Sequence, residues 1–137
     1  MMPLIKKLSE PRIFLSIGLI YTLFVTIIFL LPASEIPNIK ISFADKIAHV
    51  LIHCVLNFIW LCYCLIIKKG VIFGKNIMLV LVFCLSYGII IEVFQKWFLP
   101  SRTYDVFDVL ANVFGSMLGL LLYWLTCNKL GKLFFNK

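Results

Sequence analysis

The chain has 137 residues, of which 63% are hydrophobic, with a mean hydropathy of +1.07 and a formal net charge of +7. A soluble domain of this length has too small an interior to bury so much apolar side chain, so the composition excludes an ordinary soluble globular protein. The basic residues lie at the ends of apolar segments and not among exposed aromatic residues. This pattern predicts contact with anionic membrane lipids and argues against a nucleic-acid partner.

Four apolar segments are long enough to cross a bilayer, because about 20 helical residues span roughly 30 Å of hydrocarbon. We place these spans at residues 13–31, 46–67, 77–95 and 106–125, so that residues 1–137 form a single membrane domain. A cleaved signal peptide is the alternative interpretation of the first segment. The segment is longer than a signal core, however, and it lacks a small-x-small cleavage pattern. We therefore predict a retained helix that ends at Pro32, and an all-α bundle of four transmembrane helices.

The distribution of lysine and arginine over the helix ends predicts the orientation of the bundle. Nine basic residues fall at one set of ends and four at the other, and the positive-inside rule then places both termini in the cytoplasm. The nine are Lys6, Lys7, Arg12, Lys68, Lys69, Lys75, Lys129, Lys132 and Lys137; the four are Lys40, Lys46, Lys96 and Arg102. Aromatic residues are expected to anchor both interfaces, with Trp97 and Phe98 at the outer surface and Tyr123 and Trp124 at the inner surface.

The cysteines lie within apolar stretches and are odd in number. They are Cys54, Cys62, Cys64, Cys84 and Cys127. No pair has the spacing of zinc ligands, so we interpret all five as small packing residues and not as a disulfide framework. We expect no bound cofactor and no metal ion.

Polar residues recur where the second span begins, where the third ends and where the fourth begins. In the second span, Lys46, His49 and His53 follow one helical stripe. The second and fourth spans run inward and the third runs outward, so all three polar patches fall in the outer half of the membrane. An ionisable residue inside a bilayer costs about 2.5–3.5 kcal/mol, so we expect these side chains to face one another inside the bundle. The predicted site contains Asp45, Lys46, His49, His53, Glu92, Gln95, Arg102, Asp105, Asp108 and Asn112.

These residues also have structural interpretations. The aspartates that open the second and fourth spans fit helix N-caps, and Glu92 with Arg102 fits an ion pair that holds a loop. Gly115 and Gly119 form a GxxxG pattern, which is typical of close helix packing in membranes. A purely structural cluster does not need two histidines, several carboxylates and an arginine together, so we favour a functional site.

The order of these motifs resembles the VanZ-like family of small bacterial membrane proteins. The matching features are Asp45-Lys46-x-x-His49, Glu92-x-x-Gln95 and Arg102-x-x-Asp105-x-x-Asp108-x-x-x-Asn112-x-x-Gly115-x-x-x-Gly119, which span residues 45 to 119. The resemblance implies a multi-pass protein of the bacterial inner membrane with a role in the cell envelope. The family's namesake is linked to low-level teicoplanin resistance, but we infer no resistance role for this chain. The resemblance therefore implies a fold and a site, and no reaction.

Three functions are open on the sequence alone. We favour a non-enzymatic envelope factor that binds the headgroup of a membrane lipid or of a lipid-linked envelope precursor, with basic groups on phosphate and carboxylates on sugar hydroxyls. The alternative is a membrane-embedded enzyme acting on a lipid-phosphate or glycolipid headgroup, with His49 or His53 as base, nucleophile or metal ligand. A transporter is disfavoured because the polar stripes become apolar below Asn57 and Asn112, so that no polar path crosses the membrane.

Overall fold

The computed structural model describes residues 10–31, 44–99 and 105–135, and nearly all of them lie in four helices. In chain order these are α2 (Pro11–Leu30), α3 (Ala44–Ile67), α4 (Lys75–Phe98) and α5 (Val106–Phe135). Each is long and apolar enough to cross a membrane, and the described ranges contain no strand. The structure thus confirms the predicted all-α bundle, and the chain is a multi-pass membrane protein by the length and composition of its helices.

The bounds of two helices follow directly from local sequence and packing. α2 begins at Pro11, because a proline's fixed φ and missing N–H suit the first turn of a helix. It ends where Leu31 adopts an extended conformation, as expected for a residue that precedes proline. α5 continues well beyond its predicted end at residue 125. Its additional turns pack on the bundle, where the Phe134 ring lies edge-on to that of Phe14 with centroids 5.8 Å apart.

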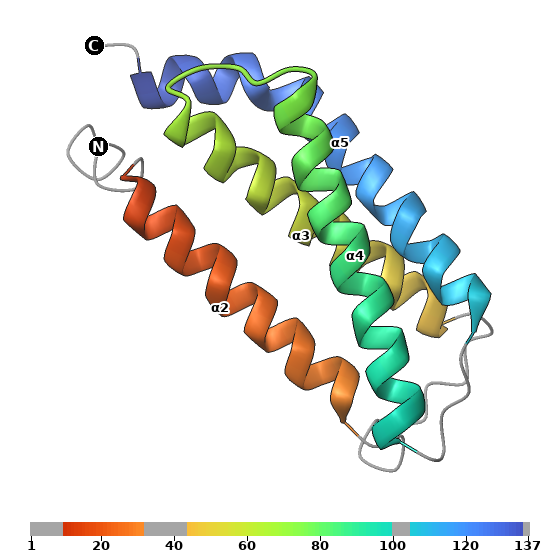
Figure 1. Cartoon of the computed structure of the whole chain (residues 1–137). Coiled ribbons are helices and arrows are strands. Elements are labelled where there is room, and N and C mark those ends of the chain that lie inside the picture. Colours follow the sequence, from red (N-terminus) through yellow and green to blue (C-terminus); the bar gives the residue numbers. More distant parts are fainter. Residues whose placement is uncertain (1–9, 32–43, 100–104, 136–137) are drawn as a thin grey trace.

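Helices α3 and α5 make the most extensive contact in the bundle. A Cβ atom on Gly119 would lie 2.5 Å from the carbonyl oxygen of Cys54, and one on Gly115 would overlap the backbone of Val50. Small residues four apart let two membrane helices approach backbone to backbone. Helix α4 crosses in front of this pair in Figure 1, and α2 packs mainly on α3. The close contact brings the first turns of α3 and α5 together.

The bundle interior is apolar toward the end where α2 begins and α5 ends. The buried core there comprises Leu56, Leu61, Leu65, Ile66, Ile72, Ile77, Val80, Cys84, Tyr123 and Cys127. The expected place of Tyr123 in the inner aromatic belt is wrong, since its side chain is fully buried and its hydroxyl accepts a 3.0 Å hydrogen bond from the backbone N–H of Ile72. Ile72 lies between α3 and α4, so its buried N–H has no helical partner and needs such an acceptor. Trp124 is partly exposed, at 43%.

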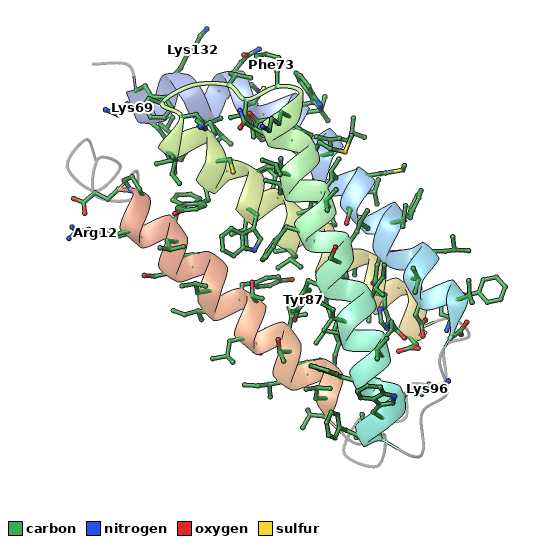
Figure 2. The ribbon with its side chains drawn as sticks, in the orientation of Figure 1. Arg12, Lys69, Phe73, Tyr87, Lys96 and Lys132 are labelled. Atoms are coloured by element: carbon green, nitrogen blue, oxygen red, sulfur yellow. The ribbon has the colours of Figure 1, made fainter. Side chains whose placement is uncertain are left out.

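Basic side chains gather at one end of the bundle. Figure 2 shows Arg12, Lys69 and Lys132 at the end where α2 begins, and Lys96 at the opposite end. The predicted orientation depends on this asymmetry, and the placement of that end in the cytoplasm stays a prediction.

Candidate functional site

Polar side chains from three helices meet where α3 and α5 begin and α4 ends. We call this group the polar cluster; its members are Asp45, Lys46, His49, His53, Glu92, Gln95, Asp105, Asp108 and Asn112. Most of these side chains are buried, whereas Asp45 and Asp105 reach the surface. The structure therefore brings the predicted residues of α3, α4 and α5 to one end of the bundle. Arg102, the remaining predicted member, lies outside the described residues.

Lys46 links the beginning of α3 to the beginning of α5. Its Nζ lies 2.5 Å from Asp105 Oδ2 and 2.6 Å from Asp108 Oδ1, with Asp45 Oδ2 at 3.6 Å. Asp105 also caps α5, because its Oδ1 accepts a 2.9 Å hydrogen bond from the backbone N–H of Phe107. The hydrogen bond from Lys46, followed by that from Phe107, holds the pKa of the Asp105 carboxyl below its usual range. The Lys46 ammonium is thus engaged by carboxylates of the protein itself.

His49 lies at the centre of the polar cluster and is 1% exposed. Its Nδ1–H donates a 2.9 Å hydrogen bond to Asn112 Oδ1, and Glu92 Oε1 lies 3.7 Å from the same nitrogen. The imidazole also stacks on the ring of Phe29, with centroids 4.5 Å apart. In the neutral ring this tautomer leaves the lone pair on Nε2, which lies 4.0 Å from Asp45 Oδ1. His49 is therefore held in one orientation, and its Nε2 has no hydrogen-bond partner among the residues that the structure describes.

Helix α2 contributes to the site through Phe29 at its end. Gln95 of α4 donates a 2.8 Å hydrogen bond to the backbone carbonyl of Phe29. This carbonyl belongs to the last turn of α2, where carbonyl groups have no N–H donor within the helix itself. The bond holds in place the aromatic ring that covers His49. The sequence carried no polar signal on this helix at that position, so the role of Phe29 was missed.

Buried polar groups continue from the cluster toward the middle of the bundle. His53 and Ser116 are 0% and 1% exposed, and neither the imidazole nitrogens of His53 nor the Ser116 hydroxyl has a hydrogen-bond partner within the described ranges. Gly88 makes room for this arrangement, since a Cβ there would lie 2.7 Å from His53 Cε1 and 2.8 Å from Asn112 Nδ2. Unpaired buried polar groups cost about 1–3 kcal/mol each, which marks the site as costly for folding.

The charge balance of the cluster is acidic. Among the described residues the cluster contains four carboxylates, three of them beside the Lys46 ammonium and that of Glu92 beside His49. Carboxylates accept hydrogen bonds from hydroxyls and amines and ligate cations. In its neutral form the His49 ring adds a nitrogen that can accept a proton or bind a metal. The arrangement can thus bind a hydroxyl-rich or cationic group.

Comparison with known proteins identifies the chain. A protein-family model described as VanZ/LLP1 matches residues 5–127. The chain belongs to the VanZ/LLP1 family. The matched region contains every member of the polar cluster, and it confirms the resemblance that the motifs of the second, third and fourth spans predicted. A search of curated proteins and a search of solved structures each returned no match.

Proposed function

We propose that this VanZ/LLP1 membrane protein binds the polar headgroup of a lipid or glycolipid at the outer surface of the bacterial inner membrane. The supporting observation is the burial of ionisable side chains at one end of an apolar bundle, with His49 1%, Glu92 2% and Asp108 7% exposed. Such residues are costly inside a membrane and are a general mark of ligand or ion sites. Asp45 and Asp105 open the cluster to the surface, where a headgroup reaches it.

The donors and acceptors of the cluster favour one kind of headgroup. Lys46 already lies between Asp105 and Asp108, so it is a weaker phosphate ligand than an unpaired lysine. The carboxylates and the amide of Asn112 are acceptors for several hydroxyls. A sugar-bearing headgroup, such as that of a lipid-linked glycan precursor, therefore fits better than a bare phosphate.

Native mass spectrometry of gently purified protein tests this proposal. We expect the wild type to retain a discrete lipid species, and His49→Ala and Asp108→Ala to lose it while remaining folded. Asn128→Ala is the matched control, since Asn128 is an exposed polar residue of α5 outside the polar cluster. The proposal fails if both cluster variants keep the lipid at the wild-type level.

A second candidate is an enzyme that acts on a lipid-phosphate or glycolipid headgroup. The observation that favours it is the Nε2 lone pair of His49, which the hydrogen bond to Asn112 holds beside Asp45 and which has no hydrogen-bond partner in the described part of the chain. A general base needs such a fixed nitrogen, within hydrogen-bond reach of the proton that it removes. Turnover of a headgroup substrate by the wild type that stops in His49→Gln would decide for the enzyme. Binding of the headgroup without turnover would exclude the enzyme and support the binding function.

The proposed orientation has a test of its own. Fluorescent protein fused after Lys137 folds and fluoresces in the cytoplasm, whereas alkaline phosphatase fused there becomes active outside it. We expect fluorescence and no phosphatase activity, because the basic residues of the described helices gather at the end where α5 finishes. The opposite pair of results would place the polar cluster at the cytoplasmic surface.

A further inference from the structure

Three side chains on the open side of the polar cluster have the arrangement of metal ligands. Asp45, His49 and Asp108 each offer one ligand atom, and these atoms lie within 4.8 Å of one another. Asp45 and His49 are four apart and share a face of α3, while Asp108 approaches from α5. His53, which the i, i+4 spacing pairs with His49, is not part of this group. We propose that Asp45, His49 and Asp108 bind a divalent metal ion, which revises the expectation from the sequence.

The orientation of His49 supports the site independently of the acidic residues. Its Nε2 has no hydrogen-bond partner among residues 10–31, 44–99 and 105–135, although the side chain is 1% exposed. Asn112 accepts the hydrogen bond from Nδ1–H, and Phe29 stacks on the ring. Metal-binding histidines almost always donate their other ring N–H to an oxygen acceptor, which fixes the tautomer and directs the lone pair at the metal. His49 shows this second-shell arrangement.

The electrostatics of the cluster also favour a cation. Lys46 supplies one positive charge to Asp45, Asp105 and Asp108, which leaves the three carboxylates with excess negative charge. The ammonium lies 2.6 Å from Asp108 Oδ1. Lys46 and the metal ion would therefore share the Asp108 carboxylate. Because the Lys46 side chain is 27% exposed, it has room to withdraw. Lys46 therefore acts as an internal cation that competes with the metal.

The ligand types indicate which ions fit. One imidazole nitrogen with two carboxylates suits Mn²⁺ or Zn²⁺, and it is a poor set for Ca²⁺, which takes oxygen ligands. Three protein ligands leave coordination positions open to a hydroxyl or phosphate from outside the protein. The inference goes beyond the headgroup proposal, because metal binding in detergent without lipid tests it alone.

The experiment uses the full chain, stripped with chelator, in a maltoside detergent at neutral pH. Mn²⁺ is the probe, because the thiols of the five cysteines compete for Zn²⁺ but bind Mn²⁺ weakly. Loss of the electron paramagnetic resonance signal of free Mn²⁺ measures binding. We compare the wild type with Asp45→Asn, His49→Gln and Lys46→Met. Glu10→Gln is the control, since Glu10 is an exposed carboxylate at the opposite end of the bundle.

We expect one Mn²⁺ per chain in the wild type and in Glu10→Gln. His49→Gln and Asp45→Asn should each weaken binding by about tenfold or more, since even outer-shell changes cost 10–100-fold. Lys46→Met should bind more tightly. If His49→Gln does not fold, Asp45→Asn provides the test, because the Asp45 side chain is exposed. Failure of the wild type to bind at about 1 mM Mn²⁺, the weak limit of extracellular cation sites, or equal binding by Asp45→Asn, would overturn the proposal.

Discussion

Asn112 Oδ1 accepts a 2.9 Å hydrogen bond from His49 Nδ1 across the contact between α5 and α3. Both side chains are almost completely buried, at 2% and 1% exposed. The bond joins the two helices that pack most closely and also fixes the tautomer of the histidine. One amide therefore serves both the fold and the chemistry of the polar cluster.

Asn112→Ala should destabilise the protein, because it leaves the Nδ1–H of His49 buried without its acceptor. We expect the free energy of unfolding to fall by about 1–3 kcal/mol, the usual cost of an unsatisfied buried donor. Reversible unfolding in mixed micelles measures the change. Asn128→Ala, an exposed position on the same helix, should alter stability by less than about 0.5 kcal/mol. Equal effects of the two substitutions would show that the Asn112–His49 bond is energetically unimportant.

Gly119→Ala should be destabilising, because the added Cβ would lie 2.5 Å from the backbone carbonyl of Cys54, and a backbone cannot move aside as a side chain can. Overpacking of this kind costs about 1–3 kcal/mol. Gly131→Ala is the matched control on the same helix, since a Cβ there would meet no atom from elsewhere in the described residues within 4 Å. It should stabilise α5 by about 0.5–1 kcal/mol through helix propensity. The same unfolding assay measures both changes in the free energy of unfolding, and we expect them to have opposite signs.

The spans and the convergence of polar residues could be predicted because both depend on periodicity and charge. A stripe such as Lys46, His49 and His53 has one sequence signature, and the cost of ionisable groups in a membrane forces it inward. The end of α5 could not be predicted in the same way. Its last turns are held by tertiary packing of Phe134 on Phe14, and a hydropathy window does not register such a contact.

Other parts of the site depend on contacts that leave no local pattern. Phe29 is one apolar residue among many in α2, and its stacking on His49 follows from the path of that helix. Tyr123 looked like an interface anchor, but a backbone N–H at Ile72 requires its hydroxyl inside the bundle. The role of Gly88 was also missed, but here the sequence does contain a signal. A lone glycine in an apolar span often marks a close approach between the helix and a neighbouring chain segment.

Gly88→Ala should disturb the polar cluster itself. The new Cβ would lie 2.7 Å from His53 Cε1 and 2.8 Å from Asn112 Nδ2, and Asn112 cannot withdraw without loosening its bond to His49. We expect destabilisation of about 1–3 kcal/mol, together with loss of any ligand that the wild type retains in native mass spectrometry. Gly131→Ala should retain the ligand. A Gly88→Ala protein with wild-type stability and ligand content would contradict the crowded geometry around His53.

Asp105→Asn gives a prediction about pH, because the bond from Lys46 lowers the pKa of the Asp105 carboxyl in the folded protein. A carboxyl that binds its proton less readily when folded stabilises the fold above its unfolded pKa, 3.8, and this contribution is lost as the pH falls through the folded-state value. Asparagine preserves the N-cap of α5, so the comparison reports on the charge. We therefore expect the wild type to unfold at a higher temperature than Asp105→Asn between about pH 5 and 7. The difference should shrink in more acidic buffer and should be much smaller in a Lys46→Met background. A difference that grows on acidification would show that the Lys46–Asp105 pair does not have the predicted role.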